Sequence, residues 1–358
     1  MSEPRHLDHL DALRGYAILA VIATHVGSAF PGLPPIAHHA LQSGQTGVQL
    51  FFVVSAVTLL HSWTARHDGA GPFYLRRFFR IAPMWMLAVV GWTILRGTAP
   101  TYWAPWGLSP WDIVAALTFV HGWLPQAING VVPGGWSIGA EAMFYLIFPV
   151  LAAIVTTRLR AVAFVVLGVL SGLVLQGLVS AWLGPIEPAH AKAAFFYFWF
   201  PNQLPAFASG FLAFQLIDKT ALPRWGAELA VLLAVAVLVV LPVLGPVPGP
   251  ILYGAIFALA AFGMGKGGGR WLVSRLVIWC GKRSYSAYFW HLALLNEGYL
   301  PPQPGGLPAF LLRFAIITGL TLALSEVSYR LIERPGIEFG RRLLTRLKAA
   351  PTPAAVPG

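Results

Sequence analysis

The stretch AVAFVVLGVLSGLVLQGLVSAWL, residues 161–183, contains no ionisable side chain and decides the fold. A helix needs about 20 apolar residues to cross the hydrocarbon core of a bilayer, and this run has that length. The chain as a whole is also strongly apolar, because 57% of its 358 residues are hydrophobic and 10% are charged. Soluble domains have about 25% charged residues. The sequence therefore predicts an all-α fold, a polytopic integral membrane protein.

Similar apolar runs recur along the chain and predict ten transmembrane helices. We expect them at residues 10–29, 45–63, 79–97, 138–157, 161–183, 195–217, 227–244, 250–265, 284–300 and 307–331. The apolar segment 111–123 lies between proline-rich stretches and is too short to span, which predicts a short re-entrant or interfacial helix. An eleventh crossing at this segment is the competing topology.

The distribution of basic residues favours ten crossings. With ten, all but four of the 24 Lys and Arg residues lie near the chain ends or on alternate loops, as expected of cytoplasmic segments under the positive-inside rule. The exceptions are Arg14, Arg96, Lys192 and Arg313. An eleventh crossing would invert every later loop and remove this bias. The pattern predicts a multi-pass protein of the inner-membrane type with both termini in the cytoplasm.

The formal net charge of +11 has the same origin. Basic loops anchor a chain against an anionic leaflet, so we expect membrane lipids as partners and no nucleic acid. The single cysteine, Cys280, excludes an intrachain disulfide and a multi-cysteine cluster, and we expect no metal. No cleavage site of the signal-peptide kind follows the first apolar run. We expect one transmembrane domain over residues 1–342 and a disordered cytoplasmic tail over 343–358.

Ionisable side chains inside membrane spans are costly, which makes them candidates for function. Arg14 and His25 lie eleven residues apart in the first span, so they project from nearly the same helix face about 16 Å apart. Arg14 should lie near the cytoplasmic boundary and His25 beyond the midplane. Two structural alternatives stay open, namely that Arg14 snorkels from the helix end and that His25 is a hydrogen-bonded packing histidine.

Glu141 is a second costly group, about one turn into a span that descends from the outer side. This position places it near the expected depth of His25. A carboxylate beside an imidazole can fix its tautomer and raise its basicity, a pairing used for general-base catalysis on hydroxyl groups. The alternative for Glu141 is a structural partner for a donor between packed helices.

Polar residues also form a stripe near the C-terminal end of the chain. Ser284, Tyr288 and His291 follow i, i+4, i+7 spacing, which places them on one helix face, and Tyr285 is adjacent. Packing explains this stripe at least as well as contact with a substrate.

Three arginines, Arg76, Arg77 and Arg80, precede the third expected span on the cytoplasmic side. Guanidinium groups at helical spacing can bind phosphates in a bidentate manner. As topology anchors they need no ligand, and composition does not decide between the two roles. Pro83 should lie in the first turns of the span, where its missing N–H costs little.

These residues belong to six motifs that follow one another over almost the whole chain. They are Leu10-Asp11-Ala12-Leu13-Arg14-Gly15 with His25; Gly47 to Ser55; Arg76-Arg77 with Arg80 and Pro83; Trp136-Ser137 with Glu141, Phe144 and Tyr145; Gly281 with Ser284-Tyr285, Tyr288 and His291; and Tyr329 with Glu333 and Pro335. Together they resemble the membrane-bound acyltransferase 3 family of bacterial O-acyltransferases. Ala56 stands where that family usually has glycine.

The resemblance implies transfer of an acyl group, often acetyl, from cytoplasmic acyl-coenzyme A (acyl-CoA) to a hydroxyl of a lipid-linked or exported glycan. It implies that Arg14, Arg76, Arg77 and Arg80 bind the donor. It further implies that His25 is the general base, oriented or charged by Glu141, although a route through an acylated histidine stays open. Weaker candidates for substrate contacts are Trp136, Ser137, Tyr145, Ser284, Tyr285 and His291.

Two other classes of function compete with this one. A transporter or flippase could use the same buried charges to move a proton or an anionic head group, but paired broken helices in the two halves are not evident. A non-catalytic scaffold does not explain three ionisable groups that face one interior. The motifs do not specify the acceptor, the acyl length or the oligomeric state. A version that needs an extracytoplasmic hydrolase-like domain would find it as a partner in another chain.

Overall fold

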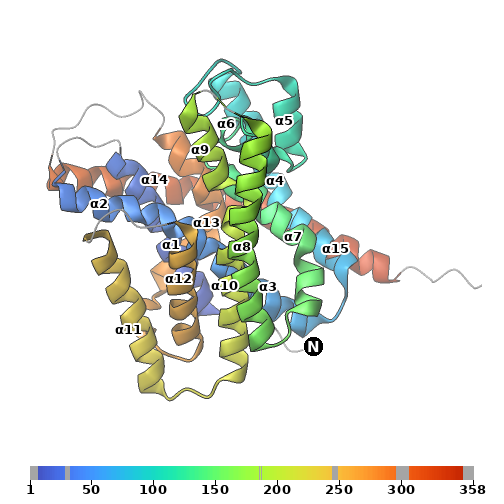
Figure 1. The fold of residues 1–358 in the computed structure, drawn as a ribbon, viewed down its shortest axis with the longest axis vertical. Helices are drawn as coiled ribbons and strands as arrows, with labels where there is room; N and C mark the ends of the chain where they lie inside the picture. The colour runs from blue at the N-terminus through green and yellow to red at the C-terminus, as the bar shows by residue number, and fades with distance from the viewer. Residues whose placement is uncertain are drawn as a thin grey trace, which may run out of the picture.

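The structure, a computed structural model, describes residues 7–28, 33–184, 186, 188–243, 249–295 and 306–349. Within these ranges the chain is helical and has no strand, so the predicted all-α fold is confirmed. Eleven of the helices have 16 residues or more (Figure 1), namely α1 (Asp8–Ser28), α3 (Gly47–Arg66), α4 (Ala70–Arg96), α7 (Trp136–Ile154), α8 (Arg158–Leu183), α10 (Phe200–Lys219), α11 (Arg224–Val240), α12 (Pro250–Gly265), α13 (Arg275–Leu294), α14 (Leu307–Ser328) and α15 (Arg334–Ala349).

Each of the ten predicted spans overlaps one of these helices. Six stretches, which contain α1, α3, α4, α7, α8 and α14, are long and apolar enough to cross a membrane by length and composition. The chain is therefore a multi-pass membrane protein, and the count of ten crossings stays a prediction. The predicted ends at residues 29, 244 and 300 lie outside the described residues.

Two helices begin nine residues earlier than predicted. Helix α4 begins at Ala70 rather than at residue 79, and α13 begins at Arg275 rather than at residue 284. The arginines expected before the third span therefore lie inside α4. Pro83 lies in the interior of α4 and not in its first turns, so that prediction was wrong. Close packing surrounds this point, since a Cβ on Gly336 would lie 2.9 Å from the Pro83 ring.

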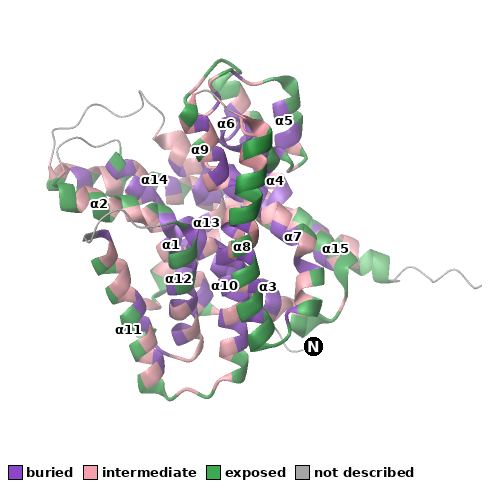
Figure 2. Cartoon of the chain, viewed as in Figure 1, coloured by how far each residue is buried: buried purple, intermediate pink, exposed green. Residues whose placement is uncertain are grey.

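Apolar side chains cover the outside of the bundle where a soluble protein would be polar. Figure 2 shows α8 exposed along much of its length and the centre of the bundle buried. Leu167, Leu173, Leu178 and Trp182 of α8 are all more than half exposed. Because large contiguous apolar surfaces are unfavourable in water, this face is suited to contact lipid chains.

Short helices cover one end of the bundle, at the top of Figure 1. They are α5 (Pro110–Leu117), η2 (His121–Trp123), α6 (Ala127–Gly130) and α9 (Ala189–Phe198). Helix α5 has eight residues, with Ser109 and Asp112 in a capping box at its start. Eight residues rise about 12 Å, far less than the ~30 Å of a bilayer core, so α5 does not provide an eleventh crossing.

Two glycines let α1 and α13 approach backbone to backbone. A Cβ on Gly15 would collide with the carbonyl oxygen of Val277, and a Cβ on Gly281 would collide with that of Asp11. Small residues at helix crossings are how membrane helices reach close van der Waals contact. Gly15 and Gly281 belong to the first and fifth motifs, so part of the function of these motifs is to join α1 to α13.

The C-terminal segment continues from α14 through a π-helical turn, η5 (Tyr329–Glu333), into α15 (Arg334–Ala349). Helix α15 packs against α4. The predicted disordered tail began at residue 343, but residues 343–349 are helical, so this boundary was placed too early. The sequence of α15 contains several arginines and has a low mean hydropathy, so hydropathy alone does not distinguish this amphipathic helix from a polar tail. Residues 350–358 of the predicted tail lie outside the described residues.

Candidate active site

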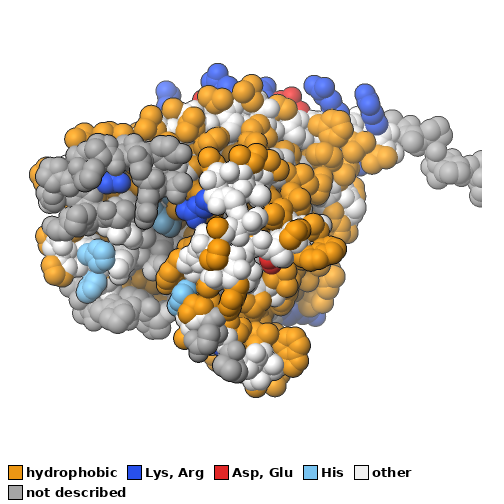
Figure 3. Space-filling model, turned by 90° about the horizontal axis from the view of Figure 1, so that it is seen from above, with side chains coloured by type: hydrophobic (Ala, Val, Ile, Leu, Met, Phe, Trp, Pro, Cys, Tyr) orange, Lys and Arg blue, Asp and Glu red, His pale blue; other side chains and the backbone are white. Residues whose placement is uncertain are grey.

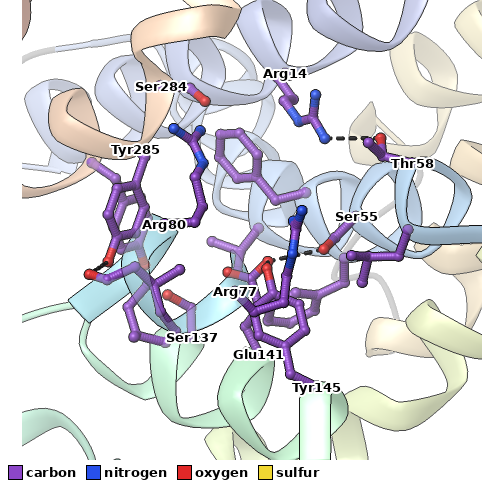
Figure 4. Close-up of a pocket in the computed structure, with 17 residues that line it drawn as sticks. Arg14, Ser55, Thr58, Arg77, Arg80, Ser137, Glu141, Tyr145, Ser284 and Tyr285 are labelled. Carbon is purple, nitrogen blue, oxygen red and sulfur yellow. Dashed lines mark hydrogen bonds between the residues drawn. The ribbon is translucent and has the colours of Figure 1, made fainter. Parts of the chain in front are cut away.

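A cavity of about 300 Å³ lies where α1, α3, α4, α7 and α13 meet. In Figure 4 the charged and hydroxyl side chains of these helices point toward one another across it. The lining residues are Arg14, Val48, Phe51, Phe52, Ser55, Thr58, Leu59, Arg77, Arg80, Ile81, Ser137, Ile138, Glu141, Tyr145, Ser284, Tyr285 and Tyr288. Five of the six sequence motifs thus contribute to one cavity.

The motif arginines separate into two groups. Arg77 and Arg80 of α4 line the cavity with Arg14 of α1, but Arg76 does not. Arg76 instead donates two hydrogen bonds to Asp68, at 2.6 and 2.9 Å. These bonds lower the pKa of the Asp68 carboxyl below its usual value. The structure therefore separates Arg76 from the other three arginines and gives it a structural partner.

Two of the cavity arginines have carboxylate partners. Arg14 contacts Asp11 and Thr58, at 2.9 and 2.8 Å, and Arg80 pairs with Glu333 at 2.9 Å. The Nε of Arg77 is buried and has no hydrogen-bond partner among the described residues. A buried N–H without a partner is costly, and an anionic ligand in the cavity would remove that cost.

Glu333 connects the sixth motif to this cavity. Its side chain is fully buried, and it accepts hydrogen bonds from Arg80, from the Ser286 backbone N–H at 3.1 Å and from the Ser286 hydroxyl. One carboxylate therefore joins η5, α4 and α13. Burying a charge is costly unless it is paired in this way, so the arrangement fixes the position of Arg80.

Glu141 lies in the cavity but is not paired with His25. Its Oε1 accepts hydrogen bonds from the Ser55 hydroxyl at 2.9 Å and the Tyr145 hydroxyl at 2.5 Å. The Cζ of Arg77 lies 5.9 Å from the centre of the Tyr145 ring. The hypothesis that Glu141 orients His25 therefore has no support in the geometry, since depth along a helix does not specify direction around it.

The neighbour of His25 is a second histidine, His291. Their ring centres are 5.1 Å apart, and the His291 ring lies 5.7 Å from the ring of Tyr288, which lines the cavity. Nδ1 of His25 lies 2.9 Å from the Val21 carbonyl oxygen. Because a carbonyl oxygen only accepts, the neutral ring carries its proton on Nδ1, which leaves the lone pair of Nε2 free.

His291 has the same arrangement. Its Nδ1 lies 3.1 Å from the Ala287 carbonyl oxygen, and its Nε2 is buried with no hydrogen-bond partner among the described residues. The structure thus brings together two imidazoles whose Nε2 atoms can accept a proton. His291 was expected only as a weak substrate contact, and its position beside His25 requires the packing of α1 against α13.

Of the other five predicted substrate contacts, four line the cavity and one does not. Ser137, Tyr145, Ser284 and Tyr285 line the cavity. Trp136 does not line it, and its ring stacks on that of Phe198 with ring centres 4.7 Å apart. Trp136 therefore supports the wall from behind.

The sequence did not single out Thr58, or assign roles to Ser55 and Tyr288, although all three line the cavity. Ser55 and Thr58 are three residues apart on α3, so their hydroxyls share one helix face. That spacing within an apolar span was the available signal. Tyr288 donates a hydrogen bond to the Gly134 carbonyl oxygen at 3.0 Å, which holds it between the cavity and His291.

Comparison with known proteins agrees with the geometry. The family described as Acyltransferase domain (Acyl_transf_3) matches residues 7–330. A protein of Staphylococcus aureus (strain COL) named "Putative O-acetyltransferase" is 24% identical over 376 residues, which cover 95% of this chain and 59% of that protein. A protein of Bacillus subtilis (strain 168) named "Putative peptidoglycan O-acetyltransferase" is 24% identical over 384 residues, 96% of this chain and 56% of that protein.

"Acyltransferase MdmB" of Streptomyces mycarofaciens is 35% identical over 153 residues, which cover 40% of this chain and 38% of that protein. The chain thus spans about three fifths of the length of the S. aureus and B. subtilis relatives. No solved structure matches the chain significantly. Because the family match covers nearly the whole chain and its motifs converge on one cavity, the chain belongs to the membrane-bound acyltransferase 3 family of O-acyltransferases.

Proposed function

We propose that this protein transfers an acyl group, most simply acetyl, from acyl-CoA to a hydroxyl of a carbohydrate or glycolipid acceptor. One observation carries the proposal: a cavity lined by three arginines adjoins, through Tyr288, a pair of histidines with free Nε2 atoms. Anion binding and proton acceptance are the two abilities that acyl transfer from a coenzyme A thioester to an alcohol requires.

The donor would bind through its phosphates. Three arginines and one glutamate line the cavity, so its lining carries an excess of positive charge. Arg77 is the main ligand in this proposal, because its Nε has no hydrogen-bond partner in the described part of the chain. Arg80 and Arg14 add charge and are positioned by Glu333 and Asp11. Arg76 is left out, because Asp68 already holds it.

The chemistry requires one proton acceptor near the thioester. Nε2 of His25 takes the proton of the acceptor hydroxyl as its oxygen attacks the thioester carbonyl. The tetrahedral intermediate then expels the coenzyme A thiolate, which takes the proton from Nε2 of His25, so that the neutral imidazole is restored and the new ester is released on the acceptor. The Val21 carbonyl stabilises the required tautomer by its contact with Nδ1 of His25.

Glu141 has a different role from the one first expected. It accepts hydrogen bonds from Ser55 and Tyr145 and offsets the charge of Arg77 nearby. In this proposal Glu141 is a positioning residue for the donor side of the cavity. It keeps the phenol of Tyr145 in place under the Arg77 guanidinium.

The acceptor and the location complete the proposal. The relatives named as O-acetyltransferases, one of them for peptidoglycan, support a glycan hydroxyl as the acceptor. The basic loops support a location in the bacterial inner membrane with both chain ends in the cytoplasm. The donor would then enter from the cytoplasmic side, and the histidine pair would lie toward the outer side.

The test is release of free thiol from acetyl-CoA by the purified protein with an extract of cell-envelope glycans. We expect release that depends on the extract, and a rate at least about 100-fold lower in His25→Ala. His190→Ala is the control, because His190 stacks on Tyr102 away from the cavity. Equal rates in wild type and His25→Ala would refute the role of His25. Glycan-dependent uptake or export without thiol release would favour a transporter.

A further inference from the structure

A second cavity, of about 700 Å³, lies beside the first turn of α3 and shares no lining residue with the active-site cavity. Its walls come from α2 (Pro35–Ser43), η1 (Gly44–Thr46), the first turn of α3, α9 and the start of α12. All of these segments lie toward the end of the bundle that holds His25 and that the basic loops avoid. Figure 3 is seen from above and shows histidine, Lys and Arg side chains and few acidic ones among the residues drawn in colour.

The lining of this cavity differs in chemistry from that of the active site. Among the described residues that line it, none is Asp, Glu, Lys or Arg. The side chains include the amides of Gln42, Gln45 and Gln49 and the aromatic rings of Trp103, Tyr197 and Tyr253. Amides with aromatic faces and no charge suit a neutral ligand that has both hydroxyl groups and apolar C–H faces.

A buried relay of hydrogen bonds sets the orientation of Gln49. Nε2 of Gln203 donates to the Tyr197 carbonyl oxygen at 2.6 Å, and Nε2 of Gln49 donates to Oε1 of Gln203 at 2.9 Å. A carbonyl oxygen only accepts, so Gln203 must turn its nitrogen toward Tyr197 and its oxygen toward Gln49. Gln49 must therefore present its own oxygen away from the relay.

The result is a buried acceptor atom with no donor. Gln49 is 1% exposed, and its Oε1 has no hydrogen-bond partner among the described residues. The same residue lines the second cavity. Leaving such an atom unpaired costs about 1–3 kcal/mol, a cost that an O–H group of a ligand would remove.

An aromatic wall stands in the same cavity. Trp103 is partly exposed, and its ring centre lies 5.6 Å from that of Phe198, which also lines the cavity. Phe198 in turn stacks on Trp136, so the wall is supported from behind. A rigid ring that is partly open offers a flat face for the C–H groups of a sugar.

We propose that this second cavity binds one neutral sugar unit of the acceptor glycan, with Oε1 of Gln49 accepting a hydrogen bond from a sugar hydroxyl and Trp103 packing on the sugar face. Because the two cavities share no lining residue, this unit is not the one that is acylated. The site would hold a neighbouring sugar of the same chain and so select oligosaccharides over monosaccharides. The inference rests on the proposed function for its substrate class but is tested by binding alone.

The experiment is isothermal titration calorimetry of the purified full chain with three neutral trisaccharides: maltotriose, cellotriose and triacetylchitotriose. We expect saturable binding of at least one of them, and affinity about tenfold weaker in Gln49→Leu. Gln215→Leu is the matched control, since Gln215 is also a buried glutamine whose Oε1 has no partner, but its amide faces the Val155 carbonyl and does not line this cavity.

Trp103→Ala is a second variant, and it removes no buried hydrogen bond. It keeps the inference testable if Gln49→Leu does not fold. We expect it to weaken trisaccharide binding and to leave binding of acetyl-CoA unchanged. Absence of binding by all three trisaccharides, or equal affinity in wild type and both variants, would overturn the inference. Trisaccharide binding that depends on Gln49 in a protein that releases no thiol from acetyl-CoA would uphold this inference and refute the proposed acyl transfer.

Discussion

Adjacent arginines of one motif should respond in opposite ways to the same substitution. Arg77 lines the active-site cavity, and its Nε has no hydrogen-bond partner within the described ranges, whereas Arg76 donates two hydrogen bonds to Asp68 outside it. Replacing each in turn by Met keeps a long side chain and removes one positive charge. The two variants therefore have the same change in net charge and differ in what the guanidinium contacted.

The expected magnitudes follow from these contacts. A hydrogen bond that involves a charged group contributes about 1.5–3 kcal/mol, and 1.4 kcal/mol corresponds to a factor of ten in Kd. One such bond from Arg77 to a donor phosphate predicts a Kd for acetyl-CoA about 10- to 100-fold higher in Arg77→Met. In Arg76→Met the Kd should change less than about twofold. The cost there should be a loss of stability of about 1–3 kcal/mol, because Asp68 loses both hydrogen bonds from Arg76.

Calorimetric titration of each purified variant with acetyl-CoA measures the Kd, and thermal unfolding in detergent measures the stability. Arg77→Lys should give an intermediate Kd, because an ammonium keeps the charge but not the planar fork of donors. If Arg76→Met weakens acetyl-CoA binding as much as Arg77→Met does, the cavity is not where the donor phosphates bind. The assignment of the donor site would then be refuted.

Two further predictions concern stability. Gly281→Ala should destabilise the protein by about 1–3 kcal/mol in thermal unfolding, because its Cβ would collide with the Asp11 carbonyl. Gly319→Ala in α14 should cost nothing, since no atom lies within 4 Å of its Cβ; equal losses in both would refute the close crossing of α1 and α13. Because Arg76 lowers the pKa of Asp68, the charged carboxyl stabilises the fold above about pH 3.9, and this stabilisation is lost as the pH falls through the lower folded-state pKa. Wild type should therefore lose more thermal stability than Asp68→Asn between pH 5 and pH 3, and parallel curves would show that Asp68 is not strongly paired.

Hydropathy located ten of the long helices, all except α15, because contact with lipid favours apolar residues. Helix α8 is the clearest case, since most of its surface faces outward and is apolar. The same signal placed the starts of α4 and α13 too late, at residues 79 and 284. The first turns of both helices carry arginines, and a window of hydropathy cannot distinguish an arginine buried by a distant partner from one in a loop.

The motifs predicted most of the cavity, but they did not predict which residues meet. Depth along a helix predicted that Glu141 lies near His25, but in the structure Glu141 accepts hydrogen bonds from Ser55 and Tyr145 instead. Direction around a helix axis depends on how neighbouring helices pack, which a spacing pattern within one helix does not contain. The pairing of His25 with His291 depends in the same way on the contact between α1 and α13.

The carboxylate of Glu333 also has a consequence for how the protein is made. Its partner Arg80 lies 253 residues earlier in the chain, and Ser286 lies 47 residues earlier. Almost all of the helices therefore leave the ribosome and enter the membrane before this contact can form. Until then Arg80 has no counter-charge from this residue, so the side chains around the cavity reach their final positions only at the end of biogenesis.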